Sequence, residues 1–463
     1  MSFDLPADLM VSLSGVRGRV GEALTPDIIV RFAGAFGAWL RTTRGDRPRV
    51  IVARDSRTSG PMFERAVIAA LQSTGCNVIQ VGLATTPTAL LAVRHHRADG
   101  AIVVTASHNP VEWNALKFAS AAGMFLDAEE APAMRAFLAD GAIRRASWDR
   151  LGELEADAEA AHRHIAAVLA IPYLDVTGLR ARRFRVALDC IRGAGSTLLP
   201  PVLEALGCEV IGINMEPDGR FPRPPEPVAA NLGELEARVR QSGADLGMAT
   251  DPDGDRLSLV SNTGHAIGED HTLAIATWLV LRHRAGPVVT NLSTSRVVED
   301  VALAANAPFE RAPVGEINVA RAMERAGAVV GGEGNGGVIL PDLQMTRDAG
   351  AAAALALQAL LEADRPMDRF MDSFASYHIV KDTLPHVGGP IEEAYALLEE
   401  RLDAPVADRR DGLRLEWPDL RQWLHLRASG TEPILRIIAE APSRNSARSM
   451  VESARQTLAR IHS

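Results

Sequence analysis

The sequence contains few cysteines and no pair of them that is spaced for a joint role. Cys76, Cys190 and Cys208 are the three cysteines in 463 residues, an odd number without a Cys-x-x-Cys motif. A disulfide framework is therefore not expected, and a reducing, cytoplasmic compartment fits best. The first ten residues also lack the basic start and apolar stretch of a secretory signal.

Long apolar runs and an excess of basic residues are absent as well. Runs such as 272–281 and 351–357 are far shorter than the roughly 20 residues of a membrane span, so we predict core helices and no membrane contact. The formal net charge of −9 argues against a nucleic-acid partner. It also means that an anionic ligand would have to be captured by local arginines and backbone N–H groups.

What the sequence does contain is the composition of an ordinary globular protein, with 47% hydrophobic and 23% charged residues. A chain of 463 residues is too long for one hydrophobic core, and its length predicts two to four domains.

An alternation of strands and helices occurs three times along the chain. In the first set, apolar strands at 50–53, 77–81 and 101–104 are separated by helical segments. Similar sets span 185–249 and 287–331, and residues 71–79 and 203–211 share one helix–glycine–strand pattern. We therefore predict three copies of an α/β unit with a largely parallel sheet, followed after about Pro366 by a smaller domain of different plan.

Each α/β set ends in a strand that leads into an unusual loop. Ligand sites in α/β sheets lie beyond the carboxyl ends of the strands, where these loops are expected. The first loop, Thr105-Ala106-Ser107-His108-Asn109-Pro110, presents the hydroxyl of Ser107 after a buried strand. Taken alone, a serine in such a turn is more often a turn former than a nucleophile.

The second loop, Asp251-Pro252-Asp253-Gly254-Asp255-Arg256, places carboxylates at alternate positions. Three like charges so close together repel unless a cation lies between them, and oxygen ligands without His or Cys favour Mg²⁺. The spacing does not match an EF-hand. The alternative is a solvated acidic turn, but the apolar strands on both sides favour a metal site.

Two further glycine-containing loops are candidates for ligand binding. Gly332-Glu333-Gly334-Asn335-Gly336-Gly337 offers a carboxylate and an amide for sugar hydroxyls, or is a plain hairpin. Arg427-Ala428-Ser429-Gly430-Thr431-Glu432-Pro433 has the features of a phosphate cradle. Arg17, between Gly15 and Gly18, and Lys117 are weaker candidates, because surface positions would explain both.

The four loops, in this order and over essentially the whole chain, resemble those of the α-D-phosphohexomutase superfamily. Asn335 without a following His, together with Ser14-Gly15-Val16-Arg17-Gly18 and Pro313-Val314-Gly315-Glu316, resembles the archaeal-type phosphoglucosamine mutases most closely. The resemblance implies three similar α/β/α mixed-sheet domains and a smaller C-terminal α+β domain of TATA-binding-protein-like plan around a central cleft. We expect these domains to span 1–150, 151–256, 257–368 and 369–463.

The resemblance also implies roles for individual residues. Ser107 would be carried as a phosphoserine and would hold Mg²⁺ together with Asp251, Asp253 and Asp255. Glu333 and Asn335 would select the sugar, and the phosphate that is not reacting would be bound by Arg427, Ser429, Gly430 and Thr431. The residues that line the transfer site would be Arg17, His108, Lys117 and Arg256, with Lys117 or His108 as the proton acceptor. In place of the usual Asn-Gly near that lysine, this chain has Trp113-Asn114-Ala115.

From these roles we expect a cytoplasmic isomerase, a phosphohexomutase that interconverts hexose 1-phosphate and hexose 6-phosphate with a hexose 1,6-bisphosphate as intermediate and activator. Glucosamine phosphate is the preferred substrate interpretation, and glucose or mannose phosphate is the alternative. A non-catalytic sugar-phosphate binder and a Mg²⁺-dependent phosphatase are the rival functions. A monomer or homodimer is expected.

Overall fold

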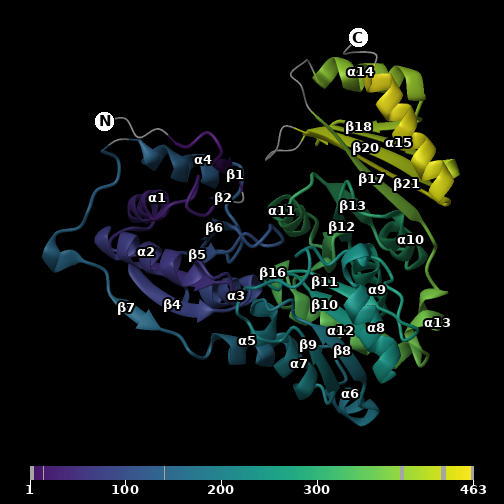
Figure 1. The fold of residues 1–463 in the computed structure, drawn as a ribbon, viewed down its shortest axis with the longest axis horizontal. Helices are drawn as coiled ribbons and strands as arrows, with labels where there is room; N and C mark the ends of the chain where they lie inside the picture. The colour runs from purple at the N-terminus through teal and green to yellow at the C-terminus, as the bar shows by residue number, and fades with distance from the viewer. Residues whose placement is uncertain (1–4, 14, 140, 386–390, 429–433, 460–463) are drawn as a thin grey trace.

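The computed structural model describes the whole chain except residues 1–4, 14, 140, 386–390, 429–433 and 460–463. The described residues form four β-sheets that follow one another along the chain, each covered by helices (Figure 1). We refer to the sheets and their helices as the first to fourth units. In Figure 1 the first unit lies at the left, the second and third lie together at the lower right, and the fourth lies above the third. No helix in the described part of the chain is long and apolar enough to cross a membrane.

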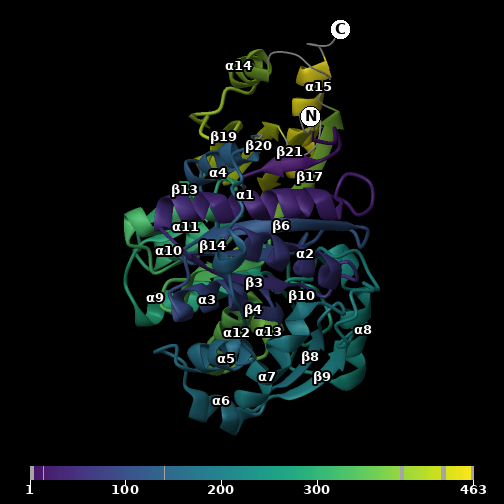
Figure 2. The same cartoon turned by 90° about the vertical axis from the view of Figure 1, so that its left-hand side faces the viewer.

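The first unit has a sheet of strand order β1-β2-β6-β5-β3-β4-β7. Alternate side chains of its central strand face two different cores. Val50 and Val52 pack with α1 and α2, whereas Ile51 packs on the opposite face with α3 and with apolar residues of the third unit (Figures 1 and 2). The elements of this unit are β1 (Met10–Ser12), β2 (Gly15–Arg19), α1 (Pro26–Arg44), β3 (Arg49–Arg54), α2 (Gly60–Ser73), β4 (Asn77–Leu83), α3 (Thr86–His96), β5 (Gly100–Val104), β6 (Trp113–Ser120), α4 (Glu130–Arg135) and β7 (Leu154–Ala156).

The second and third units share one continuous hydrophobic core, which includes Leu188 and Val202 of the second and Leu273 and Leu357 of the third. The second unit contains α5 (Ala160–Leu169), α6 (Val176–Arg182), β8 (Arg185–Asp189), α7 (Leu199–Ala205), β9 (Glu209–Ile213), α8 (Gly233–Ser242), β10 (Leu246–Thr250) and β11 (Leu257–Val260). The third contains α9 (Glu269–His283), β12 (Val288–Asn291), α10 (Arg296–Ala304), β13 (Phe309–Ala312), α11 (Glu316–Ala326), β14 (Val330–Glu333), β15 (Gly337–Leu340), β16 (Gln344–Arg347), α12 (Ala349–Ala363) and α13 (Met367–Met371).

The same arrangement of four strands recurs in the first three units, as the sequence predicts. It appears in the orders β6-β5-β3-β4, β11-β10-β8-β9 and β15-β14-β12-β13. In each, three strands are parallel and the last in sequence returns antiparallel to its predecessor. The loops with Ser107, Asp251 and Glu333 all lie at the turn between those last two strands. Equivalent positions in three repeats therefore supply three of the candidate loops.

The strand pairing moves two of the predicted domain boundaries. A boundary after Arg150 separates β7 from β4, and a boundary after Arg256 separates β11 from β10, although each pair lies in one sheet. The boundary after Arg256 follows the aspartate motif, whereas the strand that returns after this motif belongs to the same sheet. The boundary after Arg150 leaves out β7, which is a parallel edge strand beside β4.

The fourth unit is an antiparallel sheet of strand order β17-β21-β20-β19-β18 with α14 and α15 packed on one face (Figure 1). Its plan differs from the other three, as its composition predicts. Its elements are β17 (His378–Pro385), α14 (Ile391–Leu402), β18 (Val406–Asp408), β19 (Leu413–Trp417), β20 (Gln422–Ala428), β21 (Ile434–Ala441) and α15 (Arg444–Ala459).

His425 joins the fourth unit to the third. Its Nδ1 lies 2.8 Å from the Ser293 hydroxyl, which follows β12, and its Nε2 lies 2.7 Å from the backbone oxygen of Asp411. Burial lowers the pKa of His425 from 6.5 to about 4. Between these two pH values the unfolded chain binds a proton that the folded chain does not, so the free energy of unfolding must fall as the pH is lowered.

The His425→Gln variant cannot take up this proton. Between pH 6.5 and pH 4.5, we therefore expect the free energy of unfolding of the wild type to fall by about 2–3 kcal/mol more than that of His425→Gln. Denaturant unfolding of both proteins at the two pH values, followed by tryptophan fluorescence, measures the difference. If the free energy of unfolding fell equally in the two proteins, His425 would not be the group responsible for this loss of stability in acid.

Candidate active site

The Ser107 loop is fixed in position by a buried arginine. Arg57 is fully buried, pairs through Nε with Asp55 at 3.1 Å, and donates hydrogen bonds of 2.6–2.8 Å to four backbone carbonyls of the loop. These carbonyls belong to Ser107, Asn109, Pro110 and Trp113. Asp55 in turn accepts from the Thr105 hydroxyl at 2.7 Å. The local sequence gives no sign of this role for Arg57, because the four carbonyls lie 50 to 56 positions further along the chain.

Ser107 itself is held in the left-handed region at φ 49°, where a non-glycine residue is strained. Its amide donates to Thr105 Oγ1 at 3.0 Å. Its hydroxyl donates to Asp251 Oδ2 of the second unit at 3.0 Å, across 144 positions of sequence. The structure thus brings the predicted nucleophile and the aspartate loop into direct contact.

The three aspartates of the second loop form a buried cluster at the end of β10. Asp251, Asp253 and Asp255 each offer an oxygen, and these oxygens lie within 4.8 Å of one another. Asp253 Oδ1 and Asp255 Oδ1 are buried and have no hydrogen-bond partner among the described residues. Orphaned carboxylate oxygens in a site with only oxygen donors fit a hard divalent cation such as Mg²⁺.

The pKa values of the clustered aspartates are also consistent with a bound cation. Burial, together with the charges of Asp255 and Asp253, raises the pKa of Asp251 well above its ordinary value. Burial opposes ionisation of Asp253 too, but Lys117 and hydrogen bonds from Asp251, Lys117 and Thr86 outweigh it and lower its pKa. Carboxylates crowded in this way are stabilised by an added positive charge.

Lys117 and His108 contact different residues of the site, and their pKa values are shifted in opposite directions. Lys117 Nζ on β6 donates to Asp253 Oδ2 at 2.9 Å, and although burial opposes its charge, Asp253 and Asp255 raise its pKa. His108 Nδ1 lies 3.4 Å from Ser107 Oγ and 3.1 Å from a terminal nitrogen of Arg256. Arg256, burial and Arg17 lower the pKa of His108 well below its usual value.

Arg17 and Arg256 reach the same place from two different units. Arg17 on β2 donates to Asn109 Oδ1 of the serine loop at 3.3 Å. Arg256 pairs with Glu226 at 3.3 Å in addition to its contact with His108. The structure therefore gathers the four residues predicted to line the transfer site around Ser107 and the aspartate loop, and two of them are arginines suited to a phosphate.

The loop of residues 332–337, which is predicted to contact the sugar and is called the sugar loop below, lies directly beside the aspartate loop (251–256). The Leu257 amide, which opens β11, donates to the Gly336 oxygen at 2.9 Å. Glu333 is 4% exposed and accepts from Asn291 at 2.8 Å and from the Gly315 amide at 3.0 Å. Asn335 Oδ1 accepts from the Gly337 amide at 3.2 Å. Of the two predicted sugar contacts, Asn335 is partly exposed, whereas the buried carboxylate of Glu333 accepts hydrogen bonds from other groups of the protein.

Arg347 links the sugar and aspartate loops and is a residue that sequence reasoning missed. Its buried guanidinium at the end of β16 pairs with Asp255 at 2.5 Å, Glu333 at 2.7 Å and Glu316 at 3.1 Å. These carboxylates raise the pKa of Arg347 further, although burial opposes its charge. A single arginine in the Thr346-Arg347-Asp348 stretch gives no local signal, since its partners come from three other elements.

The fourth predicted loop is only partly described. Arg427 lies at the end of β20 with Nε 3.3 Å from Asp411 Oδ2, and the Asp411 carboxylate also accepts from the Val314 amide of the third unit at 2.9 Å. Ser429, Gly430 and Thr431 lie outside the described residues.

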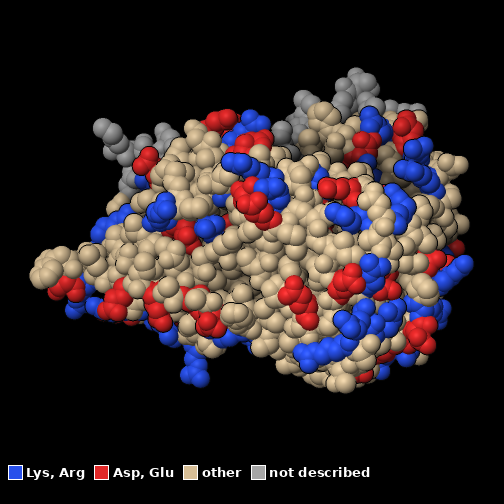
Figure 3. Space-filling model, turned by 60° about the horizontal axis from the view of Figure 1, so that its bottom comes forward, with Lys and Arg blue, Asp and Glu red and all other residues tan. Residues whose placement is uncertain are grey.

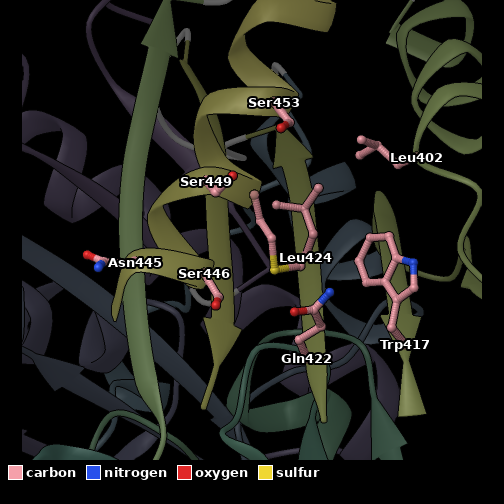
Figure 4. A pocket seen from close by; sticks show the side chains of 9 residues that line it. Leu402, Trp417, Gln422, Leu424, Asn445, Ser446, Ser449 and Ser453 are labelled. Carbon is pink, nitrogen blue, oxygen red and sulfur yellow. The ribbon is translucent and has the colours of Figure 1, made fainter. Parts of the chain in front are cut away.

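A cavity of about 450 Å³ lies elsewhere in the fourth unit, between α15, β20 and the end of α14 (Figure 4). Trp417 and Leu424 of the sheet supply apolar lining, and α15 contributes Met450 and three serines. It contains none of the predicted site residues. On the face in Figure 3, acidic and basic side chains both occur, without one continuous basic surface.

Comparison with known proteins agrees with this geometry. Four models of the phosphoglucomutase/phosphomannomutase family match in order: α/β/α domain I at 9–142, domain II at 162–264, domain III at 268–377 and the C-terminal domain at 383–456. A Thermococcus kodakarensis phosphoglucomutase/phosphomannomutase is 38% identical over 95% of this chain and 96% of its own length. A Methanopyrus kandleri protein named "Probable phosphoglucosamine mutase" is 36% identical over 94% of this chain and 95% of its own.

A solved structure shows the same fold over the whole chain. The phosphoglucomutase/phosphomannomutase family protein from Burkholderia thailandensis superposes with a TM-score of 0.83 and 25% identity, covering 97% of this chain and 98% of that one. The fold and the four matching domain models thus place the chain in the α-D-phosphohexomutase superfamily. The chain belongs to the phosphoglucomutase/phosphomannomutase family, with phosphoglucosamine mutases among its relatives.

Proposed function

We propose that this protein interconverts a hexose 1-phosphate and a hexose 6-phosphate, with Ser107 carrying the transferred phosphoryl group as phosphoserine. The observation that supports this most directly is the 3.0 Å contact between Ser107 Oγ and Asp251 at the edge of a buried three-aspartate cluster. A donor hydroxyl next to a site suited to a divalent cation is what phosphoryl transfer requires.

The reaction consists of two transfers that balance. In the first, a sugar hydroxyl oxygen bonds to the phosphoserine phosphorus, the bond between phosphorus and Ser107 Oγ breaks, and a hexose 1,6-bisphosphate forms. The hydroxyl proton passes to a protein base, and the serine oxygen takes up a proton. In the second, the bisphosphate has reoriented in the site. The Ser107 oxygen bonds to the phosphorus of the other phosphate and gives its proton to the protein base, the bond from that phosphorus to the sugar oxygen breaks, and the sugar oxygen takes up a proton. Added hexose 1,6-bisphosphate would act as an activator by phosphorylating free Ser107.

The residues of the site divide these tasks. Mg²⁺ held by Asp251, Asp253, Asp255 and the phosphoserine would neutralise charge on the transferring group. Arg17 and Arg256 would orient that group, and either His108 or Lys117 would accept the proton. Arg427, Ser429, Gly430 and Thr431 would bind the phosphate that does not react, and Glu333 and Asn335 would contact the sugar.

Glucosamine phosphate is the substrate that we propose first. The relatives named as phosphoglucosamine mutases and the archaeal-type Asn335 loop support it. Phosphomannomutase or phosphoglucomutase activity is the alternative, which the name of the Thermococcus kodakarensis relative supports. We propose a cytoplasmic location from the cysteine usage.

One assay separates the proposed function from its rivals. Purified protein with Mg²⁺ and a trace of the matching 1,6-bisphosphate is given glucosamine, glucose or mannose 1-phosphate, and the products are followed by ³¹P NMR. We expect 6-phosphate to appear, with the highest kcat/KM for the glucosamine compound. Inorganic phosphate alone would indicate a phosphatase, and no reaction with any sugar would indicate a non-catalytic binder.

A further inference from the structure

His164 in α5 is a buried polar residue that the proposed chemistry does not use. Its side chain is fully buried and both ring nitrogens have partners. Nδ1 lies 2.8 Å from Thr88 Oγ1 in the first unit, and Nε2 lies 2.7 Å from Asp348 Oδ2 in the third. An imidazole with its proton on Nε2 satisfies both contacts, because it donates to the carboxylate and accepts from the hydroxyl.

The two partners of His164 lie at the N-termini of two helices from different units. Thr88 Oγ1 contacts the hydroxyl of Thr85, the N-cap residue of α3, at 2.7 Å. Asp348 is the N-cap residue of α12 and accepts from the Gly350 and Ala351 amides at 2.9 and 3.1 Å. His164 therefore connects the caps of α3 and α12.

The same two helix ends hold the backbone of the aspartate loop. At the start of α3, Thr86 donates its amide to the Asp253 oxygen at 2.9 Å and its hydroxyl to Asp253 Oδ2 at 2.7 Å. At the start of α12, the Ala349 amide donates to the Gly254 oxygen at 3.3 Å.

The turn between these contacts leaves little room for adjustment. Gly254 has φ +69°, and a Cβ there would lie 2.6 Å from the Thr85 side chain. A shift of either helix end is therefore transmitted to the loop.

We propose that His164 is a positioning residue for the metal-binding loop: it fixes the spacing of the α3 and α12 N-termini, and through them the orientation of Asp253 and its neighbours. The inference rests on the proposed function, because it takes the aspartate loop as the Mg²⁺ site. Supporting contacts around metal ligands typically change metal affinity by about 10- to 100-fold when they are lost. His164 acts one contact further out than Thr86, so we expect the low end of this range.

The test measures cation binding directly, with Mn²⁺ as the probe and electron paramagnetic resonance of free Mn²⁺ as the readout. The full-length wild type is compared with His164→Leu, which loses both contacts, and His164→Gln, which can retain the one to Asp348. All proteins are brought to the same Ser107 phosphorylation state, checked by intact mass. Val168→Ala is the matched control, because Val168 is also fully buried in α5 and belongs to the hydrophobic core that the second and third units share.

We expect the Mn²⁺ dissociation constant to rise about 10-fold in His164→Leu and less in His164→Gln. In Val168→Ala it should stay at the wild-type value although the melting temperature falls. If His164→Leu does not fold, Thr86→Val carries the test, with an expected rise of 10-fold or more.

Wild-type affinity in a folded His164→Leu protein, or an equal loss in Val168→Ala, would overturn the positioning role and leave His164 a packing residue. Failure of the wild type to bind Mn²⁺ would instead count against the proposed function.

Discussion

Replacing Ser107 by alanine is expected to reduce mutase turnover by about 10⁴-fold or more while leaving the fold intact. The loss is large because the Ser107 hydroxyl, which donates to the Asp251 carboxylate, is the proposed carrier of the phosphoryl group. The fold should persist because the loop is held through the backbone oxygens of four residues by Arg57, and these contacts do not involve the serine hydroxyl. Initial rates with 1,6-bisphosphate present, together with circular dichroism, measure both parts.

The matched control for this substitution is Ser258→Ala. Ser258 on β11 is also buried and near the aspartate loop, but its hydroxyl has no hydrogen-bond partner among the described residues. Its removal should leave turnover within a factor of a few of wild type. Normal turnover in Ser107→Ala would refute the covalent role.

Replacing Arg347 by methionine is expected to lower the free energy of unfolding by about 3–5 kcal/mol, the range found when one partner of a buried ionic network is removed. Methionine keeps much of the side-chain volume but leaves Asp255, Glu316 and Glu333 without their shared cation. Turnover should fall as well, since the sugar and aspartate loops lose the side chain that joins them. Denaturant unfolding and kcat/KM are the measurements.

The control for Arg347 is Arg325→Met, at an exposed position in the last turn of α11. A surface substitution of this kind usually changes stability by no more than about 0.5 kcal/mol. If Arg347→Met were as stable and active as Arg325→Met, the link between the two loops would have no energetic importance.

The repeated α/β units and three of the four candidate loops could be predicted from the sequence because their signals are local. Apolar strands, helix-ending glycines and the Ser107 and Asp251 motifs are all readable within ten residues. The meeting of Ser107 with Asp251 follows from the repeat: each loop occupies the same turn of its unit, and the three units pack with those turns together.

The residues that sequence reasoning missed are those whose main partners lie far away in the sequence, within the same unit or in another one. Arg57, Arg347 and His164 lie in stretches with no distinctive spacing. Their contacts to Ser107, Asp255 and Asp348 span 50, 92 and 184 positions of sequence, respectively. The prediction for Glu333 illustrates the same limit. Its carboxylate fits a sugar contact by type, but three protein groups from distant segments occupy it in the folded chain.

The most direct test of the central claim follows the phosphoryl group itself. Protein labelled with ³²P at Ser107 by incubation with labelled glucose 1,6-bisphosphate is freed of ligand, mixed with unlabelled hexose 1-phosphate and Mg²⁺, and quenched within one turnover. We expect the label to leave the Ser107 peptide and appear in hexose 1,6-bisphosphate. Label that is found only in inorganic phosphate, or that never attaches to Ser107, would contradict the account.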